Sequence, residues 1–166
     1  ALLGETRDEL GRSEYLATVL GREEGPCPQL DLPTVRSMVD LLVEMGNDGL
    51  LSSAHDLSEG GLAVALAEAA IPNGLGAELN VETALLPAVY LFSQSAPRAV
   101  VSFPPGNERA VLEAARRHGV PTAFLGRVAK GPLRVSVSGN VVLDVPVSTL
   151  AEASSEAFEK MMEVTE

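Results

Sequence analysis

The sequence predicts an α/β (α+β) fold, in which helices pack on a layered, mixed β-sheet. Short apolar runs typical of strands alternate with helical periodicity up to about residue 120, and further strands then follow one another. The hydrophobic share is 46% but the aromatic share is 4%, so we expect an aliphatic core. With 166 residues, the simplest organisation is an N-terminal strand, helix and linker segment (1–29) followed by one α/β domain (30–166).

The first part of the chain predicts two helices separated by a loop. Residues 1–4 are typical of a strand end, and residues 13–20 of a short helix that stops at Gly21. The polar, Pro- and Gly-containing stretch 22–29 indicates a flexible connection. Asp31 is placed to cap the second helix, with Pro33 in its first turn. The periodicity predicts one buried face on that helix, made of Leu32, Val35, Val39, Leu42 and Met45.

The rest of the chain predicts alternating strands and helices, then a run of strands. Strands are expected in 49–55, 76–81 and 98–103, one in 121–128, and two in 133–145 joined by a Gly139–Asn140 turn. Helices are expected over 61–71 with Ser58 as cap, within 83–95, from an Asn107 cap to His118, and over 148–162. All strands are expected in one mixed sheet.

Composition excludes several classes of function. The net charge of −11 argues against nucleic acid as a partner, because phosphate binding needs clustered Lys and Arg. No apolar run is long enough for a membrane span, and the N-terminus lacks the features of a signal peptide. Cys27 is the only cysteine, which favours a reducing compartment, so we expect a cytoplasmic protein. The abrupt strand-like start suggests a piece of a longer polypeptide, although removal of a methionine would give the same start.

The stretch "SAHDLSEGGLAVALAEAA" (53–70) is the first candidate site. His55 and Asp56 end a predicted strand, and Gly60 and Gly61 open a predicted helix. Ligands favour the carboxyl ends of strands, and helix N-termini attract anions, so these residues and Ser58 are candidate ligand contacts. The alternative is structural: Asp56 and Ser58 cap the helix, and the glycines allow tight packing. From the local pattern the structural interpretation is favoured, because no full phosphate-loop signature is present.

The stretch "FSQSAPR" (92–98) is the second candidate. Ser93, Gln94, Ser95 and Arg98 offer hydroxyls, an amide and a guanidinium that suit a phosphate or a sugar. Turn formation explains the same residues equally well.

The acidic stretch 5–14 is a weaker candidate. Glu5, Asp8, Glu9 and Glu14 are spaced irregularly, which favours a solvated loop over a magnesium site. Cys27 lacks a neighbouring histidine, and His118 fits a helix-end cation. No residue is therefore predicted to be catalytic, and no metal site is predicted.

Three motifs nevertheless occur in the order expected of one family: "LGRSEYL", "SAHDLSEGGLAVALAEAA" and "LFSQSAPRAVVSF", which span most of residues 10–103. On these residues the chain resembles the C-terminal domain of the synthetase subunit of phosphoribosylformylglycinamidine synthase, in the aminoimidazole ribonucleotide synthetase-related superfamily. The central motif is the most specific of the three.

The resemblance implies a carbon–nitrogen ligase of de novo purine biosynthesis. That family converts formylglycinamide ribonucleotide to formylglycinamidine ribonucleotide, with ATP, Mg²⁺ and ammonia from glutamine. ATP activates the amide oxygen as an iminophosphate, from which ammonia displaces phosphate. The implied partners are preceding domains of the same chain, a glutaminase subunit and a small accessory subunit. The isolated domain is expected to be inactive, because most ATP and magnesium ligands belong to other segments, and it is expected to self-associate if it normally packs on a neighbour.

Two departures from the family pattern affect the site. The family's Gly-Gly-Ser-Glu is Gly11–Arg12–Ser13–Glu14 here, and its Ser-Glu-Ser is Ser93–Gln94–Ser95. A metal or substrate contact through that glutamate is therefore not carried over to Gln94, and His55 and Asp56 become candidates for supporting or structural roles. The alternatives to a ligase domain are a non-catalytic anion- or nucleotide-binding module and a scaffold.

Overall fold

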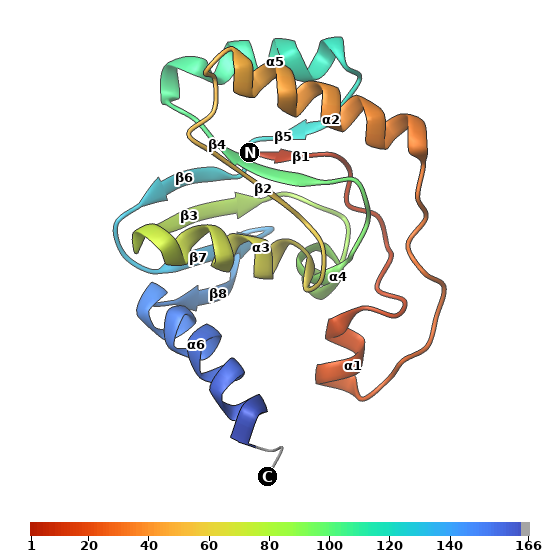
Figure 1. Cartoon of the computed structure of the whole chain (residues 1–166), viewed down its shortest axis with the longest axis vertical. Helices are drawn as coiled ribbons and strands as arrows, with labels where there is room; N and C mark the ends of the chain where they lie inside the picture. Colours follow the sequence, from red (N-terminus) through yellow and green to blue (C-terminus); the bar gives the residue numbers. More distant parts are fainter. Residues whose placement is uncertain (164–166) are drawn as a thin grey trace. The chain divides into compact units, whose positions relative to one another are not determined.

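The computed structural model describes residues 1–163, with side chains up to residue 156. The strands are β1 (Leu2–Leu3), β2 (Ser53–Asp56), β3 (Gly76–Val81), β4 (Ala99–Ser102), β5 (Thr122–Ala123), β6 (Gly126–Ala129), β7 (Leu133–Val137) and β8 (Asn140–Val145). The α-helices are α1 (Glu14–Leu20), α2 (Leu32–Asn47), α3 (Gly61–Ala70), α4 (Pro87–Phe92), α5 (Glu108–Arg117) and α6 (Val147–Glu163), with 3-10 turns η1 (Ile71–Asn73) and η2 (Pro105–Asn107) (Figure 1).

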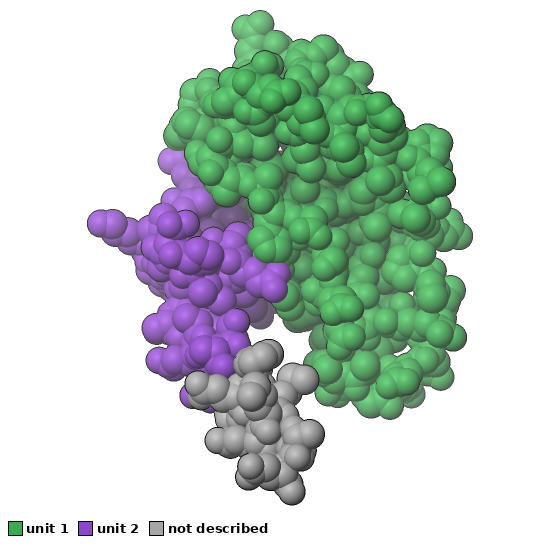
Figure 2. Space-filling model, viewed as in Figure 1, with its two compact units in different colours: residues 1–65, 83–125 green, residues 66–82, 126–166 purple. Residues whose placement is uncertain are grey.

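The chain forms two compact units, and each contains one sheet. One unit comprises residues 1–65 and 83–125, and the other comprises residues 66–82 and 126–166 (Figure 2). The first sheet has the order β2-β4-β1-β5 and the second has the order β6-β3-β7-β8. The predicted α/β class is confirmed, but the expectation of a single mixed sheet is wrong.

The segment 121–128 explains why one sheet was expected where two exist. Its pattern predicts one strand, but the chain pairs as β5 with the first sheet and as β6 with the second. The change occurs at Gly126, which has φ +152° and passes so close to β3 that a Cβ would lie 2.0 Å from the Glu78 carbonyl oxygen. Only glycine tolerates that approach, and periodicity does not reveal it.

The first sheet is antiparallel throughout and shares its core with α2 and α5. The two helices lie side by side in Figure 1 and contact each other. Their shared core consists of buried aliphatic side chains, namely Leu3, Met38, Leu41, Met45, Ala99, Val101, Val111, Ala114, Ala115 and Val120. The prediction of an aliphatic core is therefore confirmed for this unit.

The predicted buried face of α2 is right in part. Met45 is buried and Leu42 packs against the core, as predicted. Leu32 and Val39, however, are 70% and 50% exposed, and Met38 and Leu41 are buried instead. Two apolar stripes share this helix, and only packing against the sheet and α5 selects the one that is buried. The Asp31 cap with Pro33 behind it is confirmed, since the Asp31 carboxylate accepts the Thr34 N–H at 3.0 Å.

Three local expectations differ in detail from the structure. The strand expected in 49–55 begins only at Ser53, because Leu50 and Leu51 pack against the core before pairing starts. Asn107 precedes α5 as expected, but its side chain makes no cap hydrogen bond and its Nδ2 donates to the Leu50 carbonyl at 2.9 Å. Tertiary contacts override the local preference in both cases.

The third difference is in the hairpin between β7 and β8, which turns one residue earlier than predicted. Its turn residues are Ser138 and Gly139, and both have positive φ, as a two-residue hairpin turn requires. Asn140 instead begins β8.

The second sheet is mixed. β3 and β7 are parallel, whereas β6 pairs with β3 and β8 pairs with β7 in antiparallel fashion. Alternate residues of β3 and β7 are buried, namely Ala77, Leu79, Val81, Leu133, Val135 and Val137. The residues between them therefore lie on a second, polar face of this sheet. Among the described residues, no helix combines the length and apolar character of a membrane span.

Candidate functional site

The three sequence motifs meet at the side chain of Gln94. With the amide oxygen turned toward the backbone donors, Gln94 Oε1 accepts the N–H of Glu14 at 3.2 Å and the N–H of Gly60 at 3.1 Å. These amides belong to the starts of α1 and α3, where backbone N–H groups have no partner within the helix. We call Gln94 and these two amides the motif junction. One side chain thus joins segments that lie far apart in the sequence.

The glycine pair allows the loop before α3 to pass close to the end of α4. Gly60 and Gly61 have φ values of +77° and +62°, which favour glycine. A Cβ on Gly61 would lie 2.5 Å from the Ser93 carbonyl oxygen and 2.9 Å from that of Leu91. The close-packing interpretation is confirmed, although Gly61 meets the end of α4 rather than a sheet, and a Cβ on Gly60 would instead meet Val64 of α3.

Ser93 and Ser95 are fully buried and hold the N-terminal segment. Ser93 Oγ donates to the Arg7 carbonyl at 2.6 Å and accepts the Glu9 N–H at 3.0 Å. Ser95 Oγ accepts the Arg7 N–H at 3.0 Å. The two hydroxyls therefore replace the backbone partners that a regular strand would supply to this segment.

Arg98 is a buried cation held mainly by carbonyl oxygens. Its side chain is 2% exposed. Nε donates to the Ser95 carbonyl at 2.7 Å, Nη2 donates to the Ser93 carbonyl, and Nη1 donates to the Thr6 hydroxyl at 2.9 Å. Burial lowers the pKa of Arg98 to about 10, so the guanidinium remains protonated at neutral pH. It links the loop after α4 to the N-terminal segment.

Glu9 is the one acid of the stretch 5–14 that does not behave as part of a solvated loop. Its carboxylate accepts Arg7 Nε and the Gln29 N–H, both at 3.0 Å. Burial raises the pKa of Glu9, but hydrogen bonds from Gln29, Ser95 and Arg7 outweigh that effect and hold the pKa below its usual value. Glu5, Asp8 and Glu14 are exposed, as expected.

The remaining predicted residues lie at the outer edge of the first sheet, on β2 and the loop after it. His55 is paired with Val100 and Asp56 with Ala99, so the strand's alternation directs the two side chains to opposite faces. His55 Nδ1 lies 2.7 Å from the Asp56 carbonyl oxygen. The side chains of His55 and Asp56 therefore cannot act on the same atom from one face of the sheet.

Ser58 is exposed, and its backbone carbonyl accepts the Gly61 N–H at 3.1 Å at the start of α3. The backbone connects this loop with the buried cluster, since the Leu57 N–H donates to the Arg98 carbonyl at 3.0 Å.

Several residues around the motif junction were not among the predicted site residues. Thr6, Arg7 and Glu9 contribute through contacts with residues 84 to 92 positions away, and local pattern carries no signal of such contacts. Ser13, which is 1% exposed, caps α1 by accepting the Leu16 N–H at 3.3 Å. Its place before a helical run is the signal that predicts this cap. No buried side-chain nitrogen or oxygen among the described residues lacks a hydrogen-bond partner.

Comparison with known proteins identifies the family. Residues 1–138 match the family described as AIR synthase related protein, C-terminal domain. The phosphoribosylformylglycinamidine synthase subunit PurL of Thermoanaerobacter sp. is 38% identical over 152 residues, which are 92% of this chain and 21% of that protein. The subunit PurL of Nocardioides sp. is 44% identical over 143 residues, which are 86% of this chain and 18% of that protein. The chain therefore spans about a fifth of the length of these relatives.

Solved structures agree in fold. Thermotoga maritima PurL complexed with FGAR superposes with a TM-score of 0.78 at 27% identity, over 90% of this chain and 27% of that one. The same protein complexed with ATP gives a TM-score of 0.70 at 28% identity, over 90% of this chain and 25% of that one. The resemblance noted from the three motifs is thus confirmed, and the chain belongs to the family of AIR synthase related C-terminal domains.

Proposed function

We propose that this chain is the C-terminal domain of the synthetase subunit of a cytoplasmic phosphoribosylformylglycinamidine synthase, a carbon–nitrogen ligase of purine biosynthesis. The single observation that carries the proposal is the family match over residues 1–138 together with relatives that are named as subunits of that enzyme. The proposed reaction joins ammonia from glutamine to formylglycinamide ribonucleotide and is driven by ATP. Proposed partners are other domains of the same subunit, a glutaminase subunit and a small accessory subunit. A complex is supported by the similar solved structure of PurLQS from Thermotoga maritima.

The domain's own contribution is proposed to be structural. The motif junction and the cluster around it use their strongest donors and acceptors inside the domain: Gln94 holds two helix starts, and Arg98 holds two carbonyls. These hydrogen bonds are proposed to fix the relative position of α1, α3 and β4 and so to provide a rigid surface for a neighbouring catalytic domain. Isolated from that neighbour, the domain is expected to be inactive.

ATP and Mg²⁺ are cofactors of the proposed full-length enzyme. Within the part of the chain that is described, no three His, Cys, Asp or Glu side chains gather, so no cluster there would hold Mg²⁺ by protein side chains alone. Gln94, at the family's glutamate position, is neutral and occupied by backbone donors. The described residues therefore supply no side-chain cluster of their own for Mg²⁺, and no catalytic step is assigned to them.

The predicted ligand-binding residues divide into two groups under this proposal. Ser93, Ser95 and Arg98, with Gln94 and the glycine pair, are proposed to act through the position of the loops. Asp56 and Ser58 are exposed and, with half-buried His55 beside them, are the ones proposed to meet a ligand or a neighbouring domain.

A domain replacement tests the proposal. The corresponding domain of the Thermotoga maritima subunit is exchanged for this chain, and formation of product from formylglycinamide ribonucleotide, ATP and ammonia is measured. We expect activity within about tenfold of the parent subunit, whereas this chain alone should give none. A folded hybrid without activity, or robust turnover by the chain alone, would contradict the proposal.

A non-catalytic module that binds anions or nucleotides is the alternative, and calorimetry separates it from a ligase domain. We expect no tight binding of ATP, ADP or phosphate by the chain alone, because the buried polar atoms among the described residues are already paired. Micromolar binding of any of these ligands by the chain alone would favour the module.

A further inference from the structure

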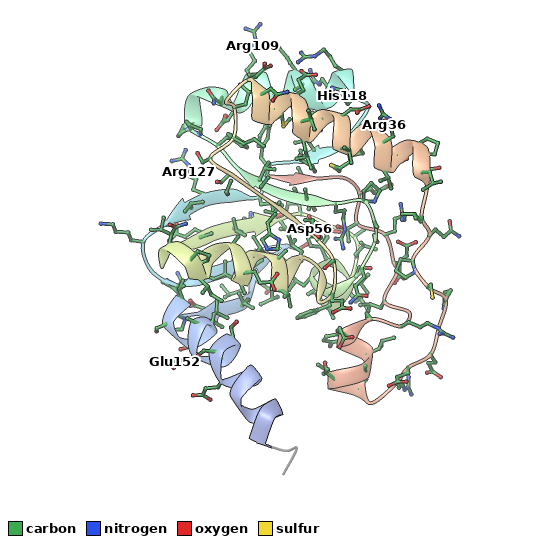
Figure 3. The ribbon with its side chains drawn as sticks, in the orientation of Figure 1. Arg36, Asp56, Arg109, His118, Arg127 and Glu152 are labelled. Carbon is green, nitrogen blue, oxygen red and sulfur yellow. The ribbon has the colours of Figure 1, made fainter. Side chains whose placement is uncertain are left out.

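The polar face of the second sheet carries a row of four charges, one from each strand. Register places Glu78 of β3 opposite Arg127 of β6 and beside Arg134 of β7, which in turn is opposite Asp144 of β8. All four residues are exposed. We call them the charge row. Arg127, labelled in Figure 3, lies at its β6 end.

The charge row lies on the face opposite the apolar interior. Along β3 and β7 buried residues alternate with exposed or half-buried ones, so Glu78 and Arg134 face away from buried Leu79 and Val135. A shallow depression on this face is lined in part by Asn80 and Ser136, which form the next row. The two central strands of this face are therefore polar, and exposed Val141 of β8 lies opposite Ser136 at the edge.

Ion pairing within the sheet leaves part of the charged groups accessible to another molecule. Arg134 Nη2 and Nε both reach the same oxygen of Asp144, Oδ2, at 2.7 and 3.1 Å. The side chains of Arg134 and Asp144 remain 47% and 41% exposed, so the solvent-facing side of this ion pair is open to another molecule.

From β6 to β8 the charges run plus, minus, plus, minus. Read in the opposite direction they run minus, plus, minus, plus, so a second copy turned by 180° presents an opposite charge at every position. We propose that a second copy of this chain docks on this face about a two-fold axis that runs parallel to the strands between β3 and β7. That axis sets Arg127 against Asp144 of the second copy and Glu78 against Arg134 of the second copy, and the symmetry repeats both pairs. A two-fold axis perpendicular to the strands would instead place each residue opposite the same residue of the second copy, so that like charges would meet. The pattern therefore selects one of the two possible face-to-face dimers.

The contact is expected to be weak and sensitive to salt. Neighbouring strands lie about 4.8 Å apart, so a four-stranded face is small beside a standard protein interface. Exposed ion pairs are individually weak and are screened over about 10 Å at 0.1 M salt and about 3 Å at 1 M. We expect a dimer at high micromolar concentration in 0.1 M salt, and an affinity at least several-fold lower in 1 M salt.

Reversals of charge in sedimentation velocity experiments test the arrangement. Arg134→Glu places two pairs of glutamates in contact, and Glu78→Arg places two pairs of arginines in contact, so each change should weaken the dimer at least tenfold. The two changes alter net charge in opposite directions, so a shared loss does not come from net charge. Circular dichroism checks that each variant is folded.

The double change E78R/R134E provides the decisive comparison. It creates the order plus–plus–minus–minus, which under the proposed axis again sets every charge against its opposite. Within one sheet, however, it places like charges side by side, so restoration of the dimer reflects contact between copies. We expect affinity within about threefold of the parent chain. A parent chain that stays monomeric at all concentrations, a dimer unaffected by the single changes, a double variant that remains monomeric, or association that strengthens in 1 M salt would each overturn the proposal.

Discussion

The two groups of predicted site residues have very different surroundings. The loop from Ser93 to Arg98 is buried, and its side chains pair with partners 86 to 92 residues away. Asp56 and Ser58 lie at the surface, on an edge strand and the loop after it. Both groups consist of small polar or charged residues beside glycine or proline. The difference shows that the same residue types serve as internal connectors or as available surface groups, depending on whether a second segment packs over them.

Gly61→Ala should give the largest effect on the buried side of this comparison. The left-handed φ costs about 1–2 kcal/mol for alanine, and the contact with the Ser93 carbonyl adds overpacking, for a total of about 4 kcal/mol. Gly49→Ala is a matched control, because Gly49 has φ +64° and no atom near its Cβ position, so it should cost only about 1 kcal/mol. Urea unfolding measures both. Equal losses in the two variants would remove the close-packing explanation.

Arg98→Met should have the next largest effect and lower the free energy of unfolding by about 3 kcal/mol. Methionine fills similar space but leaves the Ser93 and Ser95 carbonyls without their donors in a buried place. Arg36→Met, which breaks an exposed pair with Asp40, should cost about 0.5 kcal/mol or less. Thermal and urea unfolding of the two variants provide the comparison. A loss at Arg98 no larger than at Arg36 would mean that the carbonyls find other donors.

Gln94→Ala should destabilise the protein by about 1–2 kcal/mol, because the N–H groups of Glu14 and Gly60 lose their shared acceptor. Gln94→Glu restores the family's residue and should retain the stability at neutral pH, since a carboxylate accepts both N–H groups near two helix starts. Hydrogen exchange of the two amides, together with urea unfolding, measures the effect. Faster exchange in Gln94→Glu than in the parent would contradict the assigned acceptor.

The contribution of Glu9 should depend on pH. Its pKa is lowered in the folded state, so it stabilises the fold above the unfolded-state pKa of about 4.3, and this stabilisation is lost as the pH falls through the lower folded-state value. The parent chain should therefore exceed Glu9→Gln in stability at pH 6, and the difference should narrow below about pH 4. Denaturant titrations across this range test the sign. A difference that grows toward low pH would show that the carboxylate is not held by Arg7 and Gln29.

The exposed residues should give the smallest effects on stability. Asp56→Asn and Ser58→Ala should each change the free energy of unfolding by about 0.5 kcal/mol or less. If these residues meet a ligand or a neighbouring domain, the same changes should instead alter the activity of the hybrid subunit described above. A large loss of stability without any effect on activity would move them into the structural group.

Local sequence was sufficient for elements whose signals are local. Asp31 as a cap, Gly21 after a helix, and the helix that begins at Gly61 were all predicted, because a cap or a left-handed residue acts within one turn of chain. The three motifs likewise indicated the family before any fold was known. They did not show that Gln94 connects them, because hydrogen bonds between distant segments leave no periodic signal.

Tertiary structure decided what depends on close approach and on competition between faces. The split of 121–128 between two sheets depends on Gly126 meeting β3, and the buried stripe of α2 depends on which side faces α5. The sequence by itself determined composition, the Asp31 cap, most element positions and family. The separation of Ser93–Arg98 from Asp56 and Ser58 into buried and exposed groups required the fold, because burial is a property of what packs against a residue and not of the residue itself.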